Sequence, residues 1–135
     1  MYQHEFQVRV RYSETDQMGF VYYGNYAAYY EVARVEAFRA IGWSYKKMEE
    51  EGIGMPVLGM NIKYYGPAKY DELLTVKVSI PEQPRARVKF VYEITNANGK
   101  LINAAETELA FMNMNSGRPA RIPKELHELL SKYYT

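Results

Sequence analysis

The sequence contains no cysteine and only two histidines, His4 and His127. A chain without cysteine has no thiol nucleophile, no disulfide and no thiolate ligand for a metal ion. The two histidines lie far apart, and no nucleophile-elbow motif marks a catalytic serine. No metal-ligand spacing of histidines and carboxylates is present, and no glycine-rich phosphate loop. We therefore expect no metal and no separate cofactor, and we interpret both histidines as structural.

Long apolar runs and an excess of one charge are also missing. No apolar run approaches the roughly 20 residues that span a bilayer, and charges interrupt the first ten residues, unlike a signal peptide. The formal net charge is +1, which does not indicate a nucleic-acid partner. With 135 residues, 47% of them hydrophobic, the chain is expected to form a single domain over residues 1–135. The lack of cysteine fits a reducing compartment, so we expect a cytoplasmic protein.

Aspartate is scarce as well, and one of the two aspartates stands in a conspicuous place. Asp16 belongs to a polar loop that also contains Gly19 and runs directly into a helix start. A carboxylate can act as a base or a nucleophile, and free backbone N–H groups at a helix start can hold an oxyanion. From these residues alone, an ordinary loop or capping carboxylate is the other interpretation.

The periodicity predicts one strand, then one long helix. Residues 4–12 alternate between apolar and polar side chains, as in a half-buried strand. Asn25 is a candidate N-cap for a helix over residues 26–41, which Gly42 would end. Apolar residues lie on most sides of this helix, and its five alanines would let a sheet approach closely. Two i,i+3 ion pairs are expected on it, Glu31 with Arg34 and Glu36 with Arg39.

The rest of the chain reads as a short helix, four strands and a final helix. Ser44 would cap the short helix, Asn98-Gly99 is a strong hairpin signal, and Pro123 would open the last helix at its first position. Short connections favour antiparallel pairing, and one apolar helix would then lie against one sheet in an α+β arrangement. The expected strands cover residues 58–64, 74–80, 86–94 and 101–113, and the expected helices residues 44–51 and 123–132.

Tyrosine is abundant, with fourteen in the chain and five of them between Tyr22 and Tyr30. Its ring is apolar and its hydroxyl is polar. The cluster suits a pocket wall or a subunit interface, and a half-buried core face is the alternative.

These motifs, in this order, resemble the hotdog-fold thioesterases, and most closely the 4-hydroxybenzoyl-CoA and short-chain acyl-CoA thioesterase group. The resemblance rests on Thr15-Asp16-x-x-Gly19-x-Val21-Tyr22-x-x-x-Tyr26, on Glu31-x-Ala33-Arg34, and on Tyr64-x-x-Pro67-Ala68-x-Tyr70-Asp71-Glu72. It implies an antiparallel sheet of about five strands wrapped around the long helix. It also implies a homodimer or homotetramer whose active sites lie between two subunits.

The same resemblance implies roles for individual residues. The catalytic carboxylate falls on Asp16, and the helix-start amides fall on Tyr22 and Tyr23. Residues for substrate contact fall on Tyr12, Gly19 and Tyr26. Because coenzyme A (CoA) carries phosphates, basic residues are expected to bind it, and the alternative for them is a solvated strand edge. The candidates are Arg85, Arg87, Lys89, Arg118 and Arg121.

The predicted function is that of an acyl-CoA thioesterase, which hydrolyses its substrate to a free acid and CoA. CoA is then part of a small-molecule substrate and not a cofactor. Two alternatives are a non-catalytic module that binds acyl thioesters of CoA or acyl carrier protein, and a hotdog hydratase or dehydratase. The latter usually needs a histidine, and none lies near Asp16 in the sequence. Acyl length, and aromatic versus aliphatic preference, are not set by these patterns.

Overall fold

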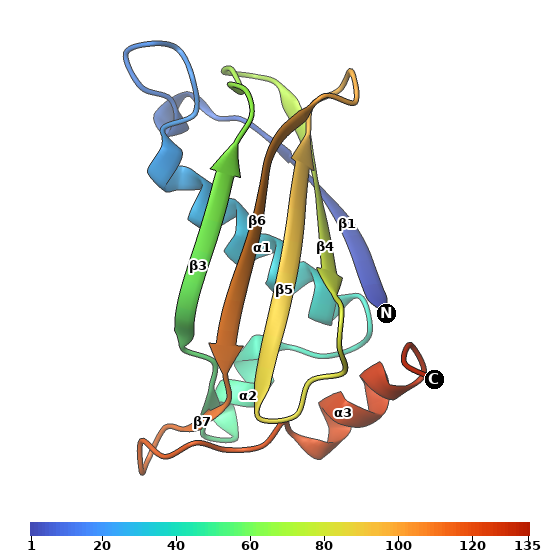
Figure 1. The fold of residues 1–135 in the computed structure, drawn as a ribbon. Coiled ribbons are helices and arrows are strands. Elements are labelled where there is room, and N and C mark those ends of the chain that lie inside the picture. The colour runs from blue at the N-terminus through green and yellow to red at the C-terminus, as the bar shows by residue number, and fades with distance from the viewer.

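A computed structural model describes all 135 residues as one sheet with helices on one side and at one end (Figure 1). The strands of this sheet are β1 (Tyr2–Arg9), β3 (Val57–Tyr64), β4 (Leu73–Ile80), β5 (Arg87–Thr95) and β6 (Leu101–Ala110). The α-helices are α1 (Tyr26–Arg39), α2 (Tyr45–Glu50) and α3 (Lys124–Ser131). Two 3-10 turns, η1 (Tyr12–Glu14) and η2 (Tyr23–Asn25), precede α1, and a small second sheet pairs β2 (Ile53–Gly54) with β7 (Met112–Asn113).

The main sheet is antiparallel throughout and has the order β1-β4-β5-β6-β3. The predicted Asn98-Gly99 turn joins β5 to β6, and Gly99 has the positive φ of 79° that such a turn requires. Its geometry is held by the Asn96 side chain, which accepts from the amides of Asn98 and Lys100 at 3.0 Å each. The predicted class of fold is confirmed, and the strand order makes β1 and β3 the two edges.

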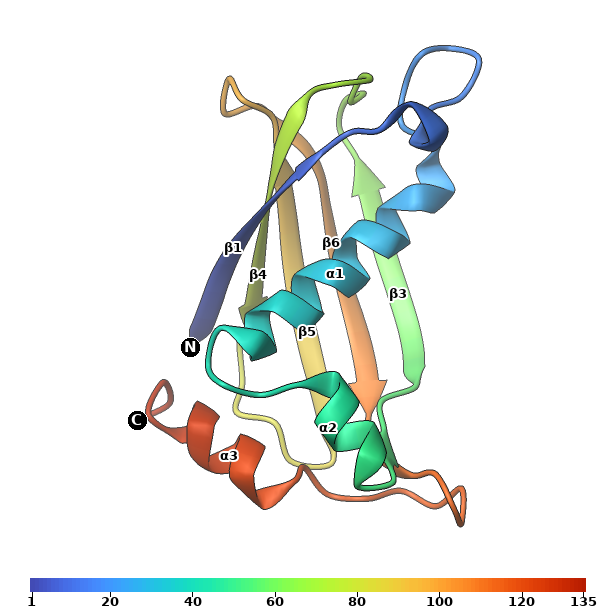
Figure 2. The same ribbon diagram turned by 180° about the vertical axis from the view of Figure 1, so that it is seen from behind.

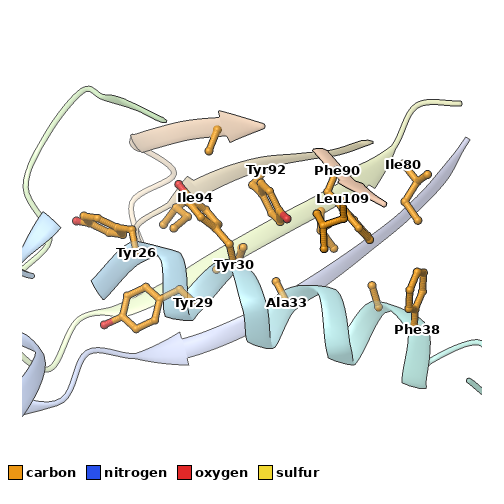
Figure 3. Packing of buried hydrophobic residues seen from close by; sticks show 14 of the residues in the cluster. Tyr26, Tyr29, Tyr30, Ala33, Phe38, Ile80, Phe90, Tyr92, Ile94 and Leu109 are labelled. Carbon is orange, nitrogen blue, oxygen red and sulfur yellow. The ribbon is translucent and has the colours of Figure 1, made fainter. Parts of the chain in front are cut away.

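Helix α1 crosses one face of this sheet diagonally, from the end of β3 towards β1 and β4 (Figure 2). Ala33 and Ala37 are fully buried, so the helix backbone lies close to the strands, as the alanine content predicts. Around them Tyr30, Phe38 and Phe90 fill the space between helix and sheet (Figure 3). The central core is therefore strongly aromatic.

One predicted ion pair is wrong and the other is confirmed. Glu36 and Arg39 lie 3.7 Å apart, as expected. Arg34, in contrast, turns into the core and forms no ion pair with Glu31. Its guanidinium donates to the Tyr92 hydroxyl at 3.0 Å, and that hydroxyl also bonds Thr107 at 2.7 Å. Arg34 thus links α1 to two strands of the sheet.

Two predicted helix starts are also corrected. The Asn25 side chain does not cap α1 but donates to the Glu14 carbonyl at 2.9 Å. Pro123 is the N-cap residue of α3 instead of its first helical residue. Ser44 does cap α2, because its hydroxyl accepts from the Lys47 amide at 3.4 Å.

Candidate active site

Asp16 lies in the loop between β1 and α1, and this loop is a tight, internally bonded turn. Thr15 and Val21 form an isolated bridge across it, and Gly19 turns the chain with a φ of 82°. One oxygen of the half-buried Asp16 carboxylate, Oδ1, accepts from the amides of Met18 at 2.9 Å and Phe20 at 3.3 Å. No hydrogen bond of the chain reaches Oδ2. The carboxylate is therefore fixed by one oxygen and free at the other.

Glu14 fastens this loop to α1. Its buried carboxylate accepts from the Arg11 guanidinium at 2.7 Å and from the Tyr29 hydroxyl at 2.9 Å. Its carbonyl accepts from the Tyr22 amide and the Asn25 side chain, both at 2.9 Å. Burial by itself would raise the pKa of Glu14, but the bonds from Arg11 and Tyr29 and the Arg11 charge outweigh burial, so this pKa is lowered. Glu14 is ionised at neutral pH and acts as a structural anchor.

The amides at the start of α1 are the second part of the site. The Tyr22 amide is engaged by Glu14, which differs from the expectation that Tyr22 and Tyr23 would both offer free N–H groups. The amides of Tyr23 and Gly24 have no acceptor in the chain, so Gly24 takes the place of Tyr22 in this pair. Gly24 is also a tight position, because an added Cβ would lie 2.8 Å from the ring of Tyr22. Sequence reasoning missed Gly24, although a glycine directly at a helix start was its signal.

Aromatic rings surround these amides. The rings of Tyr22 and Tyr23 are 4.8 Å apart, and Tyr64 at the end of β3 lies 6.5 Å from Tyr23 and 5.8 Å from Tyr26. Tyr22, Tyr23 and Tyr64 are exposed, whereas Tyr26 is buried beneath them. Tyr26 is thus the inner support of an exposed tyrosine surface in the single subunit. Burial raises the pKa of Tyr26 to about 12, so its ring stays neutral.

The other predicted contact residues lie on the outer side of the loop. Tyr12 is exposed and meets Tyr70 edge to face at 5.6 Å. Gly19 is exposed at the loop tip, where an added Cβ would meet nothing within 4 Å, so its positive φ and not close packing requires glycine.

The five predicted cations divide into different environments. Arg87 pairs with Glu108 at 2.7 Å and Lys89 with Glu106 at 3.0 Å, across neighbouring strands on the sheet face opposite α1. Arg118 is exposed in the loop after β7. Arg85 and Arg121 line a common pocket beside α3, and neither forms an ion pair. The start of β5, the loop after β7 and α3 lie at the end of the sheet away from the loop that precedes α1 (Figure 1).

The two histidines lie outside the Asp16 loop. His4 lies on β1 and His127 on α3, and neither bonds to the Asp16 loop. No group of three or more His, Asp and Glu side chains is placed to hold a metal ion. No helix has the length and apolar character needed to cross a membrane.

Comparison with known proteins gives consistent matches over nearly the whole chain. A family model described as the thioesterase-like superfamily matches residues 10–130. The acyl-CoA thioester hydrolase YbgC of Escherichia coli is 33% identical over 119 residues, which cover 88% of this chain and 89% of YbgC. A crystal structure of the DHNA-CoA thioesterase of Staphylococcus aureus matches with a TM-score of 0.93 and 36% identity, over 98% of this chain and 91% of that one. A structure of a 4-hydroxybenzoyl-CoA thioesterase mutant with bound 4-hydroxybenzoyl-CoA matches with a TM-score of 0.84 and 25% identity, over 96% and 99% of the chains.

Proposed function

Because this chain belongs to the thioesterase-like superfamily and is an acyl-CoA thioesterase, we propose that Asp16 and the amides of Tyr23 and Gly24 carry its reaction. The observation that carries the proposal is the pairing of a carboxylate free at one oxygen with two free N–H groups at a helix start. Two products result from the reaction, a free acid and the CoA thiol.

The amides would act on the thioester carbonyl. As the carbonyl carbon is attacked, its oxygen gains negative charge, and the two N–H groups of Tyr23 and Gly24 donate to it. The positive end of the α1 dipole supports the same charge. One such donor is typically worth about 2.7–4 kcal/mol of transition-state stabilisation.

Asp16 would act through its free oxygen, by one of two routes. As a general base, Oδ2 takes a proton from the attacking water. As a nucleophile, it attacks the carbonyl carbon, expels the CoA thiolate and leaves a mixed anhydride that water then hydrolyses. A burst of CoA thiol equal to the enzyme concentration would identify the nucleophilic route. The absence of a burst would indicate either the general-base route or a nucleophilic route in which water hydrolyses the anhydride rapidly.

Substitution of Asp16 tests the proposal. Asp16→Asn keeps an oxygen that can accept from the amides of Met18 and Phe20, so the loop should stay folded. Its kcat should fall by about 10²–10⁴-fold, the usual contribution of a positioned acid–base group. Asp71→Asn is the matched control, because Asp71 is exposed and asparagine tolerates its φ of 70°. Full activity in a folded Asp16→Asn protein would refute the assignment.

We further propose that the working unit is a homodimer, alone or within a tetramer, paired through β3. This edge strand exposes Val57, Leu58, Met60 and Tyr64, whereas the outward residues of the other edge, β1, are polar or charged. Met60 and Tyr64 pair with the buried Thr107 and Asn103, so they project on the α1 side of the sheet, where α1 does not cover them. An apolar edge with unpaired backbone groups favours pairing with a second edge.

A two-fold contact of this kind would place the site between subunits. Two β3 strands paired antiparallel around a two-fold axis bring the start of one beside the end of the other. The Asp16 loop lies at the end of β3, so it would face the beginning of the partner's β3. Light scattering should report a dimer or a multiple of it, and Met60→Glu should produce an inactive monomer. An active monomer at micromolar concentration would contradict this arrangement.

The exposed rings of Tyr22, Tyr23 and Tyr64 favour an aromatic acyl group. Flat rings stack on or meet the edges of other rings, and such pairs contribute about 0.5–1.5 kcal/mol beyond area burial. A panel of aryl and alkyl acyl-CoA substrates, followed by free-thiol detection, should give the higher kcat/KM with aryl groups. Equal kcat/KM values for alkyl groups of similar size would contradict the aromatic preference.

A cytoplasmic location stays a prediction from the absence of cysteine.

A further inference from the structure

One fully buried side chain of the sheet has a hydrogen-bond donor without a partner. Asn103 lies on β6, has no exposed surface and reaches α1, because its amide oxygen Oδ1 accepts from the Tyr30 hydroxyl. No atom of the chain accepts from its amide nitrogen Nδ2. This nitrogen can only donate, and a buried donor left unpaired costs free energy. The core therefore contains a donor that lacks an acceptor.

Asn103 differs in this respect from the other buried polar residues. The carboxylate of Glu14 accepts from two side chains, and the hydroxyl of Thr107 bonds a tyrosine hydroxyl. Arg34 donates to that same tyrosine. Its guanidinium also lies near the hydroxyl of Tyr45, because it opposes the rise in the pKa of Tyr45 that burial causes. The remaining unpaired buried atoms lie near the start of β1, beyond the end of α1 and between β4 and β5, on His4, Trp43 and Gln83.

The unpaired nitrogen of Asn103 adjoins the exposed tyrosine surface at the start of α1. Tyr64 lies opposite Asn103 in the pairing of β3 with β6, so both side chains project on the same face of the sheet. The Tyr64 ring is 5.8 Å from the ring of Tyr26 and 6.5 Å from that of Tyr23. Burial, followed by Tyr64 and Glu72, raises the pKa of Tyr26 to about 12, and the Asn103 side chain opposes this rise. Asn103 therefore lies close to the Tyr26 hydroxyl, beneath this surface.

The separation between Asn103 and the free amides suits one aromatic group. Tyr30, which bonds Asn103, is six residues beyond Gly24, or about 9 Å along a helix axis. Side chains of a helix lean towards its start, and the rings of Tyr26 and Tyr30 lean that way (Figure 3). The lean brings the Tyr30 hydroxyl, and Asn103 with it, closer to the amides. An acyl ring whose thioester carbonyl is held by the amides would extend over Tyr26 towards Asn103.

We propose that Asn103 determines specificity for the acyl group by donating from Nδ2 to an oxygen at the end of the acyl ring far from the thioester. The inference rests on the proposed function, since it takes the amides of Tyr23 and Gly24 as the place of the carbonyl. Tyr64 is half exposed on an edge strand, so its ring can move aside to admit the acyl group. Nδ2 selects for an acceptor: a hydroxyl oxygen satisfies it, whereas a hydrogen atom or an aromatic amino group leaves it unpaired.

Two variants isolate Nδ2 without leaving the Tyr30 hydroxyl unpaired. Tyr30→Phe removes the bond between Tyr30 and Asn103 and keeps the amide, and it is the matched control. Adding Asn103→Leu removes the amide and keeps a side chain of similar size. The measurement is kcat/KM for benzoyl-CoA, 4-aminobenzoyl-CoA, and 3- and 4-hydroxybenzoyl-CoA. Relative to benzoyl-CoA, the double variant should lose about 3–10-fold on at least one hydroxybenzoyl substrate, the contribution of one hydrogen bond, and nothing on 4-aminobenzoyl-CoA.

Each comparison is a ratio of two substrates within one variant, so a general loss of activity cancels. Thermal melts establish folding, and Asn103→Ala in the Tyr30→Phe background provides a second replacement with the same expectation. Equal losses on all substrates would show that Asn103 is only structural, and a loss confined to 4-aminobenzoyl-CoA would show that its oxygen faces the ligand. Either result, or no loss on any substrate, would overturn the inference. The role of Asp16 is tested separately, because Asp16→Asn should lose activity on every substrate whether or not Asn103 is present.

Discussion

The hydroxyl of Tyr29 donates to the carboxylate of Glu14 at 2.9 Å, and this buried bond joins the Asp16 loop to the first turns of α1. Tyr29 lies on the helix whose first amides would hold the oxyanion, and Glu14 lies two residues before Asp16. The ionised carboxylate and the neutral hydroxyl are mutually stabilising: the pKa of Glu14 is lowered, and burial together with Glu14 raises the pKa of Tyr29. This contact therefore helps to fix the position of Asp16, the proposed base, relative to the free amides at the start of α1.

Loss of the Glu14 charge should destabilise the protein in a pH-dependent way. Because the folded pKa lies below the ordinary value of about 4.3, ionised Glu14 contributes stability above that value, and the contribution is lost as pH falls through the folded pKa. Glu14→Gln should lower the free energy of unfolding by about 1–3 kcal/mol at pH 7, since Arg11 and Tyr29 lose a charged acceptor. Urea titrations should show the gap closing below about pH 4. Glu93→Gln, at an exposed carboxylate, should show no such gap, and a gap independent of pH would contradict the assignment.

The close approach of Gly24 to the Tyr22 ring leads to a second prediction. A double variant can distinguish the effect of this contact from a general loss of folding. In Gly24→Ala the new Cβ would meet the Tyr22 ring at 2.8 Å, so the ring or the turn must move. We expect kcat to fall because the adjacent amides lose their alignment. The fall should be at most roughly 10²–10³-fold, which is the usual cost of losing one oxyanion donor. Adding Tyr22→Ala removes the clash and should restore much of the loss relative to Tyr22→Ala alone. A Gly24→Ala enzyme with unchanged kcat would contradict the expected displacement of the turn and would mean that the exposed Tyr22 ring moves aside instead.

Arg34 and Tyr92 should respond unequally to substitution. Arg34 is buried without a carboxylate, so Arg34→Met replaces an expensive cation with an apolar chain of similar length. Tyr92→Phe instead leaves the Arg34 guanidinium and the Thr107 hydroxyl without their shared partner, at a cost of about 1–3 kcal/mol. Denaturant unfolding should therefore show a larger loss for Tyr92→Phe than for Arg34→Met. The reverse order would mean that the Arg34 guanidinium, through its hydrogen bond to Tyr92, stabilises the core by more than its burial costs.

Mixed dimers can test which subunit supplies the expected CoA-binding residues Arg85 and Arg121. In one chain the Asp16 loop and α3 lie at opposite ends of the sheet, and antiparallel pairing of β3 would bring each loop to the partner's α3 end (Figure 1). A heterodimer of Asp16→Asn and Arg85→Gln chains would then contain one fully wild-type site, if Arg85 binds CoA as expected. It should have about half the wild-type kcat with the wild-type KM. If Asp16 and Arg85 served the same site from one chain, the only active site would carry the Arg85→Gln substitution and its KM would be raised.

The local sequence determined most of the secondary structure, because the signals act within a few residues. The alternation in β4 and β5, the Gly99 turn and the Ser44 cap each depend on their neighbours alone. Asp16 could also be selected from the sequence, since its loop, its glycine and the following helix form one continuous motif. The grouping of these elements as a thioesterase relied on the motif as a whole, and the comparisons confirmed it.

Other features depended on residues that meet only in three dimensions. Arg34 and Glu31 have the right spacing for an ion pair, but Tyr92, 58 residues away, offers Arg34 a buried partner that no helical pattern can reveal. Asparagine is a common helix N-cap, yet the Asn25 side chain donates to the Glu14 carbonyl. The Tyr22 amide donates to the same carbonyl. Arg85 and Arg121 line a common pocket only because α3 packs beside the entry of β5. Periodicity reports which face of an element is apolar, whereas tertiary packing decides which donor, acceptor or charge lies opposite each polar group.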